Sequence, residues 1–122
     1  MTQPLALLLY EKLLPGSQLA NRLQDLGWRV QTLHDGDALT RAAEEHKPVL
    51  VLADLVSSHG SVCAAIKFLR DNKSTEHIPV IAFAADEALH KEAAGAGATL
   101  AVGDAAILQH LSQLIDQALT EF

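Results

Sequence analysis

Three acidic residues lie where carboxylates can do chemistry, each within two residues of the end of an apolar run: Glu11, Asp54 and Asp104. Carboxylate oxygens are the ligands that hard cations such as Mg²⁺ and Ca²⁺ prefer. One hypothesis is therefore that these three side chains converge into a cluster that binds such a cation. In the simpler interpretation, Asp54 is solvated in a turn and Asp104 is the N-cap of the last helix, because aspartate caps helices well.

The element that positions Asp54 is predicted from the stretch KPVLVLADL, Lys47 to Leu55. Pro48 disfavours helix at Lys47. The run Val49 to Ala53 is apolar throughout, which is typical of a strand buried on both faces. Such strands belong to parallel sheets covered by helices on each side, and reacting groups in those folds lie at the carboxyl ends of the strands. Asp54 is therefore the first candidate for a functional residue.

The rest of the chain alternates between strand and helix signals. Further strands are expected at Leu5 to Leu9, Arg29 to Leu33, Val80 to Ala84 and Thr99 to Val102. Helices are expected from Ser17 after a Pro15-Gly16 break, from about Ala38 to His46, over Val62 to Leu69, after an Asp86 cap, and from Ala105 to about Thr120. The expected inner faces include Leu19, Leu23 and Leu26 in the first helix and Leu39, Ala42 and Ala43 in the second.

Strict alternation predicts an α/β fold with a doubly wound, five-stranded parallel sheet in a three-layer, flavodoxin-like sandwich. Arg29 to Leu33 alternates polar and apolar residues, as an edge strand does, which favours the strand order 2-1-3-4-5. At 122 residues, with no repeat or linker, the chain is expected to be a single domain, 1–122.

Charge and composition exclude several classes of partner. The formal net charge is −6, so the basic surface that nucleic acid or an anionic membrane requires is not expected. Cys63 is the only cysteine and cannot form an intramolecular disulfide. The amino terminus lacks the basic region of a signal peptide. A cytoplasmic location is therefore expected.

Several short stretches in a fixed order resemble the receiver domain of response regulators, the CheY-like family. They are Gly27-Trp28, HDGDAL from His34 to Leu39, KPVLVLADL, HIPVIAFAA from His77 to Ala85, and AGA from Ala96 to Ala98. The resemblance extends over nearly the whole chain. It implies a place in two-component signalling or a phosphorelay, where Asp54 would be the residue that accepts a phosphoryl group from a histidine kinase.

The other functional positions of that family are altered in this chain. Two acids after the first strand hold Mg²⁺ in the family, and here these positions are Tyr10 and Glu11. A hydroxyl after the fourth strand is replaced by Ala84, and an aromatic in the fifth strand by Ala101. The alignment places Asp104 where the family has a lysine that neutralises the phosphate, and Ser58 where a proline is usual.

These changes predict a pseudo-receiver, a domain that keeps the fold and loses the switch. Phosphoryl transfer depends on positioning and on cations that spread the developing charge. Exchanging lysine for Asp104 removes an attraction and adds a repulsion, each roughly 3 kcal/mol at about 5 Å and an effective dielectric near 20. We also consider that the ring of Tyr10 fills the emptied metal pocket.

The leading functional hypothesis is a non-enzymatic, phosphorylation-independent module that binds another protein, such as a signalling partner or a kinase-related protein, without a cofactor. Family members use the fourth helix, fifth strand and fifth helix, or the first helix, for such contacts. The corresponding surfaces here include Glu87 to Glu92 and Gln109 to Gln117. One alternative is a slow phosphoacceptor that uses Asp54, with Mg²⁺. Another is a cation or small-ligand sensor at the acidic crevice where the strands end.

Overall fold

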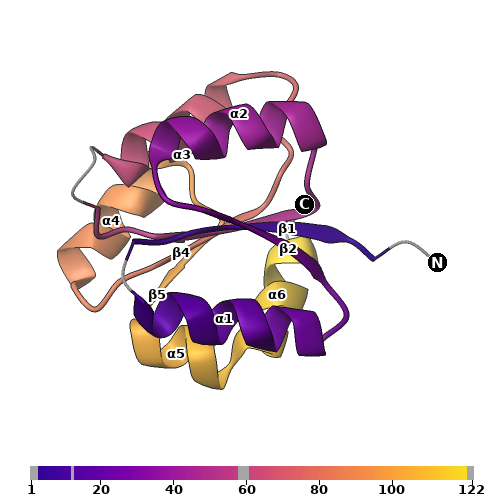
Figure 1. Ribbon diagram of the computed structural model, residues 1–122. Coiled ribbons are helices and arrows are strands. Elements are labelled where there is room, and N and C mark those ends of the chain that lie inside the picture. Colours follow the sequence, from indigo (N-terminus) through magenta and orange to yellow (C-terminus); the bar gives the residue numbers. More distant parts are fainter. Residues whose placement is uncertain (1–2, 12, 58–60, 121–122) are drawn as a thin grey trace.

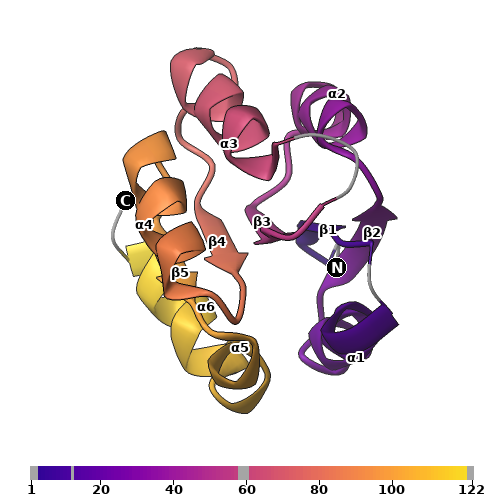
Figure 2. The same ribbon diagram turned by 90° about the vertical axis from the view of Figure 1, so that its left-hand side faces the viewer.

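The computed structural model describes residues 3–11, 13–57 and 61–120 and contains the predicted parallel sheet. Its five strands have the order β2-β1-β3-β4-β5, which confirms the expected topology (Figure 2). They are β1 (Leu5–Leu9), β2 (Arg29–Leu33), β3 (Leu50–Asp54), β4 (Val80–Phe83) and β5 (Leu100–Val102). All four pairs of neighbouring strands are parallel.

The helices form a layer on each face of the sheet (Figure 1). One layer consists of α2 (Gly36–His46), α3 (Val62–Asp71) and α4 (Glu87–Ala96). The other consists of α1 (Leu13–Asp25), α5 (Asp104–Gln109) and α6 (Leu111–Thr120). Among the described residues, no helix is both long and apolar enough to cross a lipid bilayer.

Strand side chains alternate between two apolar cores, one under each layer. On β1, Leu5, Leu7 and Leu9 pack with α2, α3 and α4, whereas Ala6 and Leu8 pack with α1, α5 and α6. All five residues of β3 are buried. The strands at the two edges, β2 and β5, are partly exposed. The central position of β3 therefore explains why its sequence is apolar without alternation.

The strand boundaries differ from the expected ones by a single residue. Val49 was expected to begin the central strand but precedes β3 and is 44 % exposed, while Asp54 is the last residue of β3. The fourth strand ends at Phe83 rather than Ala84, and the fifth begins at Leu100 rather than Thr99. None of these changes moves a core residue to the other face of the sheet.

The first helix begins earlier than predicted, so the Pro15-Gly16 break and the Ser17 cap were wrong. Helix α1 starts at Leu13 and contains both residues in its first turns. A proline is tolerated there because the backbone N–H groups of a first helical turn have no intrahelical partner. Leu26 was also wrongly placed on the inner face, since it follows the end of α1 and is 48 % exposed.

The starts of α2 and α4 follow capping interactions. Helix α2 begins at Gly36, two residues before the expected start, because the side chain of Asp35 accepts a hydrogen bond from the backbone N–H of Ala38. The side chain of Asp86 caps α4 through the N–H of Ala88, as predicted. Such hydrogen bonds satisfy backbone N–H groups in the first turn, which have no partner within the helix.

The single long helix expected from Ala105 to Thr120 is divided in two at His110, which ends α5 with φ −122° and ψ 27°. No proline or glycine lies at this break. Apolar residues of both helices are buried in the core beside α1: Ile107, Leu111, Ile115 and Ala118. The apolar periodicity therefore continues across the break, which is why the sequence did not reveal it.

Arg70 on α3 joins the segments that lead into β4 and β5. Its Nε donates to the carbonyl oxygen of Gly97 at 2.6 Å, and its Nη2 donates to Oγ1 of Thr99 at 3.0 Å. Its Nη1 donates to the carbonyl oxygens of Glu76 at 2.8 Å and Ile78 at 2.6 Å. Partial burial lowers the pKa of this guanidinium, but it remains protonated. Arg70 therefore holds together the segments at the amino-terminal ends of β4 and β5.

Candidate functional site

The side chain of Asp54 is buried at the carboxyl end of β3, with 1 % of its surface exposed. Its Oδ1 accepts a hydrogen bond from the backbone N–H of Val56 at 3.0 Å, so the turn after the strand holds the carboxylate. Asp54 is paired in register with Phe83 on β4. The neighbouring pair on the other side is Ala53 with Leu9 on β1. Asp54 thus lies centrally in the sheet, where ligand sites of open α/β folds occur.

Tyr10 follows β1 and continues its ladder, because its backbone N–H donates to the carbonyl oxygen of Leu33 at 3.0 Å. The ring is half-buried and meets the ring of His34 edge to face at 5.5 Å between centroids. It also lies directly against Gly16, where an added Cβ would collide with it. These contacts direct the ring toward α1 and the end of β2. The filling of the space beside Asp54 by Tyr10 remains a prediction.

The predicted cation-binding cluster of Glu11, Asp54 and Asp104 is not found. Within residues 3–11, 13–57 and 61–120, no three His, Cys, Asp or Glu side chains are grouped so that they could hold a metal ion. Glu11 is half-buried after Tyr10. Strand ends bring residues to the same edge of a sheet, but a shared ion also requires that their side-chain oxygens converge.

Asp104 is the first residue of α5, and the N-cap is Gly103. The prediction that Asp104 caps the helix was therefore wrong by one residue. An acid in the first helical turn is still favourable, because it faces the positive end of the helix dipole. The Oδ1 atom of Asp104 is buried and has no hydrogen-bond partner in the described part of the chain. A buried carboxylate oxygen thus lies near the end of β5.

Ala84 and Ala101 stand at positions where the family resemblance implies functional side chains. Ala84 is fully buried, and its N–H donates to the carbonyl oxygen of Val102 at 3.1 Å. Its own carbonyl oxygen lies 2.7 Å from Nε2 of His90 on α4. Ala101 is half-buried on β5 beside Ala82. Ser58 lies outside the described residues. The contact of His90 was missed from the sequence, because its partner is a backbone carbonyl.

The described residues lack one of the two acids that the family resemblance implies as Mg²⁺ ligands. Mg²⁺ in proteins is usually held by one or two carboxylates at near-octahedral geometry, and phosphate oxygens often complete the set. Here the phenol of Tyr10 stands at one of the two positions where the resemblance implies a metal-binding acid, and no three-ligand group is found among the described residues. We therefore derive no chemical step through a metal ion.

Comparison with known proteins defines the class of fold. No protein-family profile and no curated protein matches the chain. Among solved structures, a putative response regulator from Chloroflexus aurantiacus has a TM-score of 0.89 and 16% identity, covering 98% of this chain and 99% of that one. The chemotaxis protein CheY4 of Vibrio cholerae has a TM-score of 0.86 and 17% identity, with 97% and 100% covered.

The receiver domain of a sensor histidine kinase from Pseudomonas aeruginosa has a TM-score of 0.88 and 19% identity over 98% of this chain and 99% of that one. That structure contains a magnesium ion in its active-site cleft. The chain therefore has the receiver fold over nearly its entire length. At these identities the similarity establishes the architecture, and the chemistry must be judged from the residues at the strand ends.

Proposed function

We propose that this domain is a pseudo-receiver, a cytoplasmic signalling module that binds another protein and is neither switched by phosphorylation nor active as an enzyme. It is proposed to need no cofactor. The receiver fold provides the scaffold, and Asp54, at the carboxyl end of β3, stands where the family resemblance implies the phosphoacceptor. The proposal concerns the groups around that residue, since an aspartate alone does not carry out phosphoryl transfer.

The observation that carries the proposal is the carboxylate of Asp104, which stands where the family resemblance implies a lysine. Its Oδ1 is buried without a hydrogen-bond partner among the described residues, so an acid and not a cation lies at this end of β5. A phosphoryl group on Asp54 would add further negative charge. Phosphoryl-transfer sites stabilise such charge with cations and hydrogen-bond donors. An acid at position 104 opposes that stabilisation.

The parts that would report a phosphoryl group also support the proposal. In the family, a hydroxyl after the fourth strand contacts the phosphoryl group, whereas the methyl group of Ala84 cannot donate a hydrogen bond. The carbonyl oxygen of Ala84 already contacts His90, which links the strand end to α4. The position of α4 is therefore held by a contact that needs no phosphate.

The test is incubation with acetyl phosphate and Mg²⁺, followed by intact-mass spectrometry. We expect no phosphoryl adduct on the wild-type domain, and we expect Asp54→Asn to bind the physiological partner as well as wild type does. An adduct on the wild type that disappears in Asp54→Asn would overturn the proposal.

A variant that carries the side chains implied by the family resemblance tests whether their absence prevents phosphorylation. Tyr10→Asp, Ala84→Thr and Asp104→Lys, combined in one chain, return an acid, a hydroxyl and a cation to the strand ends. We expect this variant to form the adduct, because the scaffold is the same. A matched control carries Glu45→Lys in place of Asp104→Lys, so that the charge changes equally on the exposed face of α2.

A second candidate function, a slow phosphoacceptor, is favoured by the placement of Asp54. Its carboxylate lies at the carboxyl end of the central strand and is oriented by the N–H of Val56. Beryllofluoride, which imitates an aspartyl phosphate, distinguishes the two functions. Specific backbone amide shifts around Asp54 and on α4 in nuclear magnetic resonance spectra would favour the phosphoacceptor. Unchanged spectra would favour the phosphorylation-independent module.

A further inference from the structure

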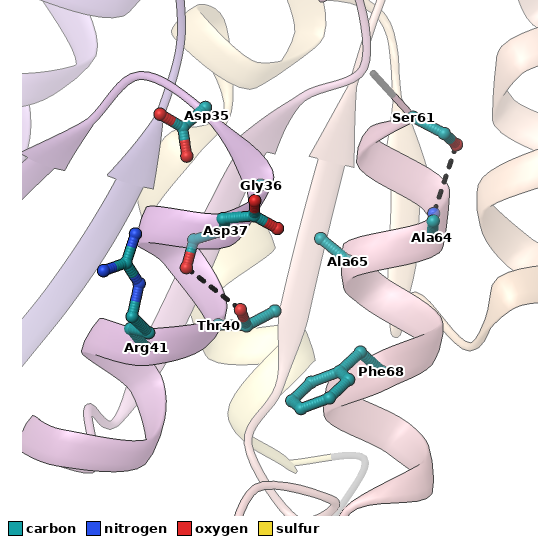
Figure 3. Close-up of a pocket in the computed structure, with 9 residues that line it drawn as sticks. All are labelled: Asp35, Gly36, Asp37, Thr40, Arg41, Ser61, Ala64, Ala65 and Phe68. Atoms are coloured by element: carbon teal, nitrogen blue, oxygen red, sulfur yellow. Dashed lines mark hydrogen bonds between the residues drawn. The ribbon is translucent and has the colours of Figure 1, made fainter. Parts of the chain in front are cut away.

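A groove of about 680 Å³ lies between α2 and α3 and is lined mainly by their first turns, which follow the carboxyl ends of β2 and β3. Figure 3 shows the two helices as its walls, with side chains from both directed into the space between them. Gly36 lets the start of α2 approach α3, since a Cβ there would lie 3.2 Å from the Cβ of Ala65. The small side chains of Ala64 and Ala65 leave space for the groove beside α3.

One end of the groove is apolar. Phe68 on α3 is 46 % exposed, and Figure 3 shows its ring extending toward α2. An exposed aromatic side chain on a surface groove is typical of protein interaction sites, because its burial by a partner stabilises the complex without a large loss of side-chain entropy. Phe68 is thus the candidate apolar anchor.

The other end of the groove is acidic. The side chain of Asp35 is used as the N-cap of α2, but the carboxylate of Asp37 has no hydrogen bond or ion pair within the described chain. Arg41 also lines the groove, although Figure 3 shows its guanidinium on the side of α2 that faces away from α3. Among the charged residues that line the groove, the two aspartates at the start of α2 outnumber Arg41, so this wall has an excess of acidic residues.

On α3, the nearby charges cancel. Lys67 pairs with Asp71 at 3.1 Å, so this wall adds no net charge beside Phe68. The groove therefore combines an acidic wall, an exposed aromatic ring and a volume sufficient for several side chains. Its complement is a segment that carries a basic residue next to an apolar one.

We propose that the α2–α3 groove docks a basic, apolar-containing peptide segment of a partner protein, with a Lys or Arg of the segment at Asp37 and an apolar side chain against Phe68. This inference rests on the proposed function, since it names the surface by which a phosphorylation-independent module would bind. It differs from the surfaces expected from the sequence, which involve α1, α4 and the helices after β5.

The test begins with selection of a phage-displayed library of random linear peptides on the intact domain. Isotope-labelled domain is then titrated with an enriched peptide. We expect enrichment of Arg or Lys beside Leu, Phe or Tyr, with the largest amide shifts at Gly36, Thr40 and Ala64. Binding should weaken with added salt, because the exposed carboxylate of Asp37 is screened.

Matched variants assign the binding to the two wall residues. Phe68→Ala should weaken binding at least about tenfold, whereas Leu26→Ala, an equally exposed apolar residue outside the groove, should not. Asp37→Asn should weaken binding about threefold to fivefold, whereas Glu87→Gln, also an acid in a first helical turn, should not. Both wall residues are exposed, so the variants should fold, and circular dichroism melting checks this.

Three results would overturn the inference. They are the absence of any enriched peptide, amide shifts that map to α4, α5 or α6, and concentration-dependent self-association through the groove without peptide. Failure of the groove inference can also be distinguished from failure of the proposed function. A phosphoryl adduct on Asp54 would overturn that function and leave peptide binding in place, whereas loss of peptide binding would overturn the groove alone.

Discussion

The Nε2 atom of His90 lies 2.7 Å from the carbonyl oxygen of Ala84, which ties α4 to the segment that follows β4. Ala84 stands where the family resemblance implies a hydroxyl that contacts the phosphoryl group. The same strand end that would communicate with a phosphoryl group is thus connected to α4 by a side chain. For this contact to be a hydrogen bond, Nε2 carries the proton, because a carbonyl oxygen only accepts.

We predict that His90→Ala lowers the free energy of unfolding by about 1 kcal/mol, the usual net value of one hydrogen bond. Urea denaturation followed by circular dichroism measures the change. The control is His77→Ala, which alters an exposed loop histidine. Equal stability of the two variants would mean that the contact with Ala84 contributes nothing.

Arg70→Lys should destabilise the domain by roughly 3 kcal/mol although charge is conserved. Lysine cannot reproduce the planar fork that reaches Gly97, Thr99 and the carbonyl oxygens of Glu76 and Ile78, and charge-assisted hydrogen bonds are the stronger ones. The matched control is Arg41→Lys on the exposed face of α2, which should change the free energy of unfolding by less than about 0.5 kcal/mol. Similar midpoints of urea unfolding for both variants would contradict this role.

The contact between Tyr10 and Gly16 should be visible in a double-mutant cycle. Gly16→Ala is expected to be destabilising by about 1 to 3 kcal/mol, because the new methyl group would overlap the Tyr10 ring. In a Tyr10→Ala background the same substitution should be neutral or stabilising, since alanine favours helix more than glycine does. Equal effects of Gly16→Ala in both backgrounds, measured by thermal unfolding, would show that the ring does not pack there.

The thiol of Cys63 should be poorly reactive at neutral pH. Burial, and to a smaller extent the negative charge of Glu92, raise its pKa above the ordinary value of 9.0. Alkylation by iodoacetamide should therefore be slower than for free cysteine and should accelerate in Glu92→Gln but not in the exposed-loop variant Glu76→Gln. The raised pKa favours the protonated thiol in the folded state, so its contribution to stability is complete below pH 9.0 and is lost as the pH rises through the folded pKa. Faster alkylation than free cysteine at pH 7 would contradict the raised pKa.

The sheet and its core followed from the sequence because burial on both faces leaves a clear signature. The apolar runs at Leu5–Leu9 and Val49–Ala53, and the alternation at Arg29–Leu33, favoured the strand order that the structure confirms. Helix ends were predicted less well. The start of α1 was missed because proline is as compatible with a first helical turn as with a break, and the division at His110 leaves the apolar periodicity intact.

The contacts that shape the candidate site were harder to predict from the sequence. His90 and Arg70 bind mainly backbone carbonyl oxygens, which every residue possesses, so no spacing of residue types points to them. The carboxylate cluster failed for a related reason. Positions after strand ends predict proximity along the edge of the sheet, but side-chain direction decides whether oxygens can share an ion, and that direction depends on local turns such as the one at Val56.

Because the strands all run in one direction, the two ends of the sheet are held by different groups. At the amino-terminal ends of β4 and β5, the guanidinium of Arg70 donates to the carbonyl oxygen of Ile78 and to Oγ1 of Thr99. At the opposite end, Oδ1 of Asp54 accepts from the backbone N–H of Val56. Asp54→Ala should therefore reduce the protection of the Val56 amide from hydrogen exchange, while the amides of Ile78 and Thr99 remain protected.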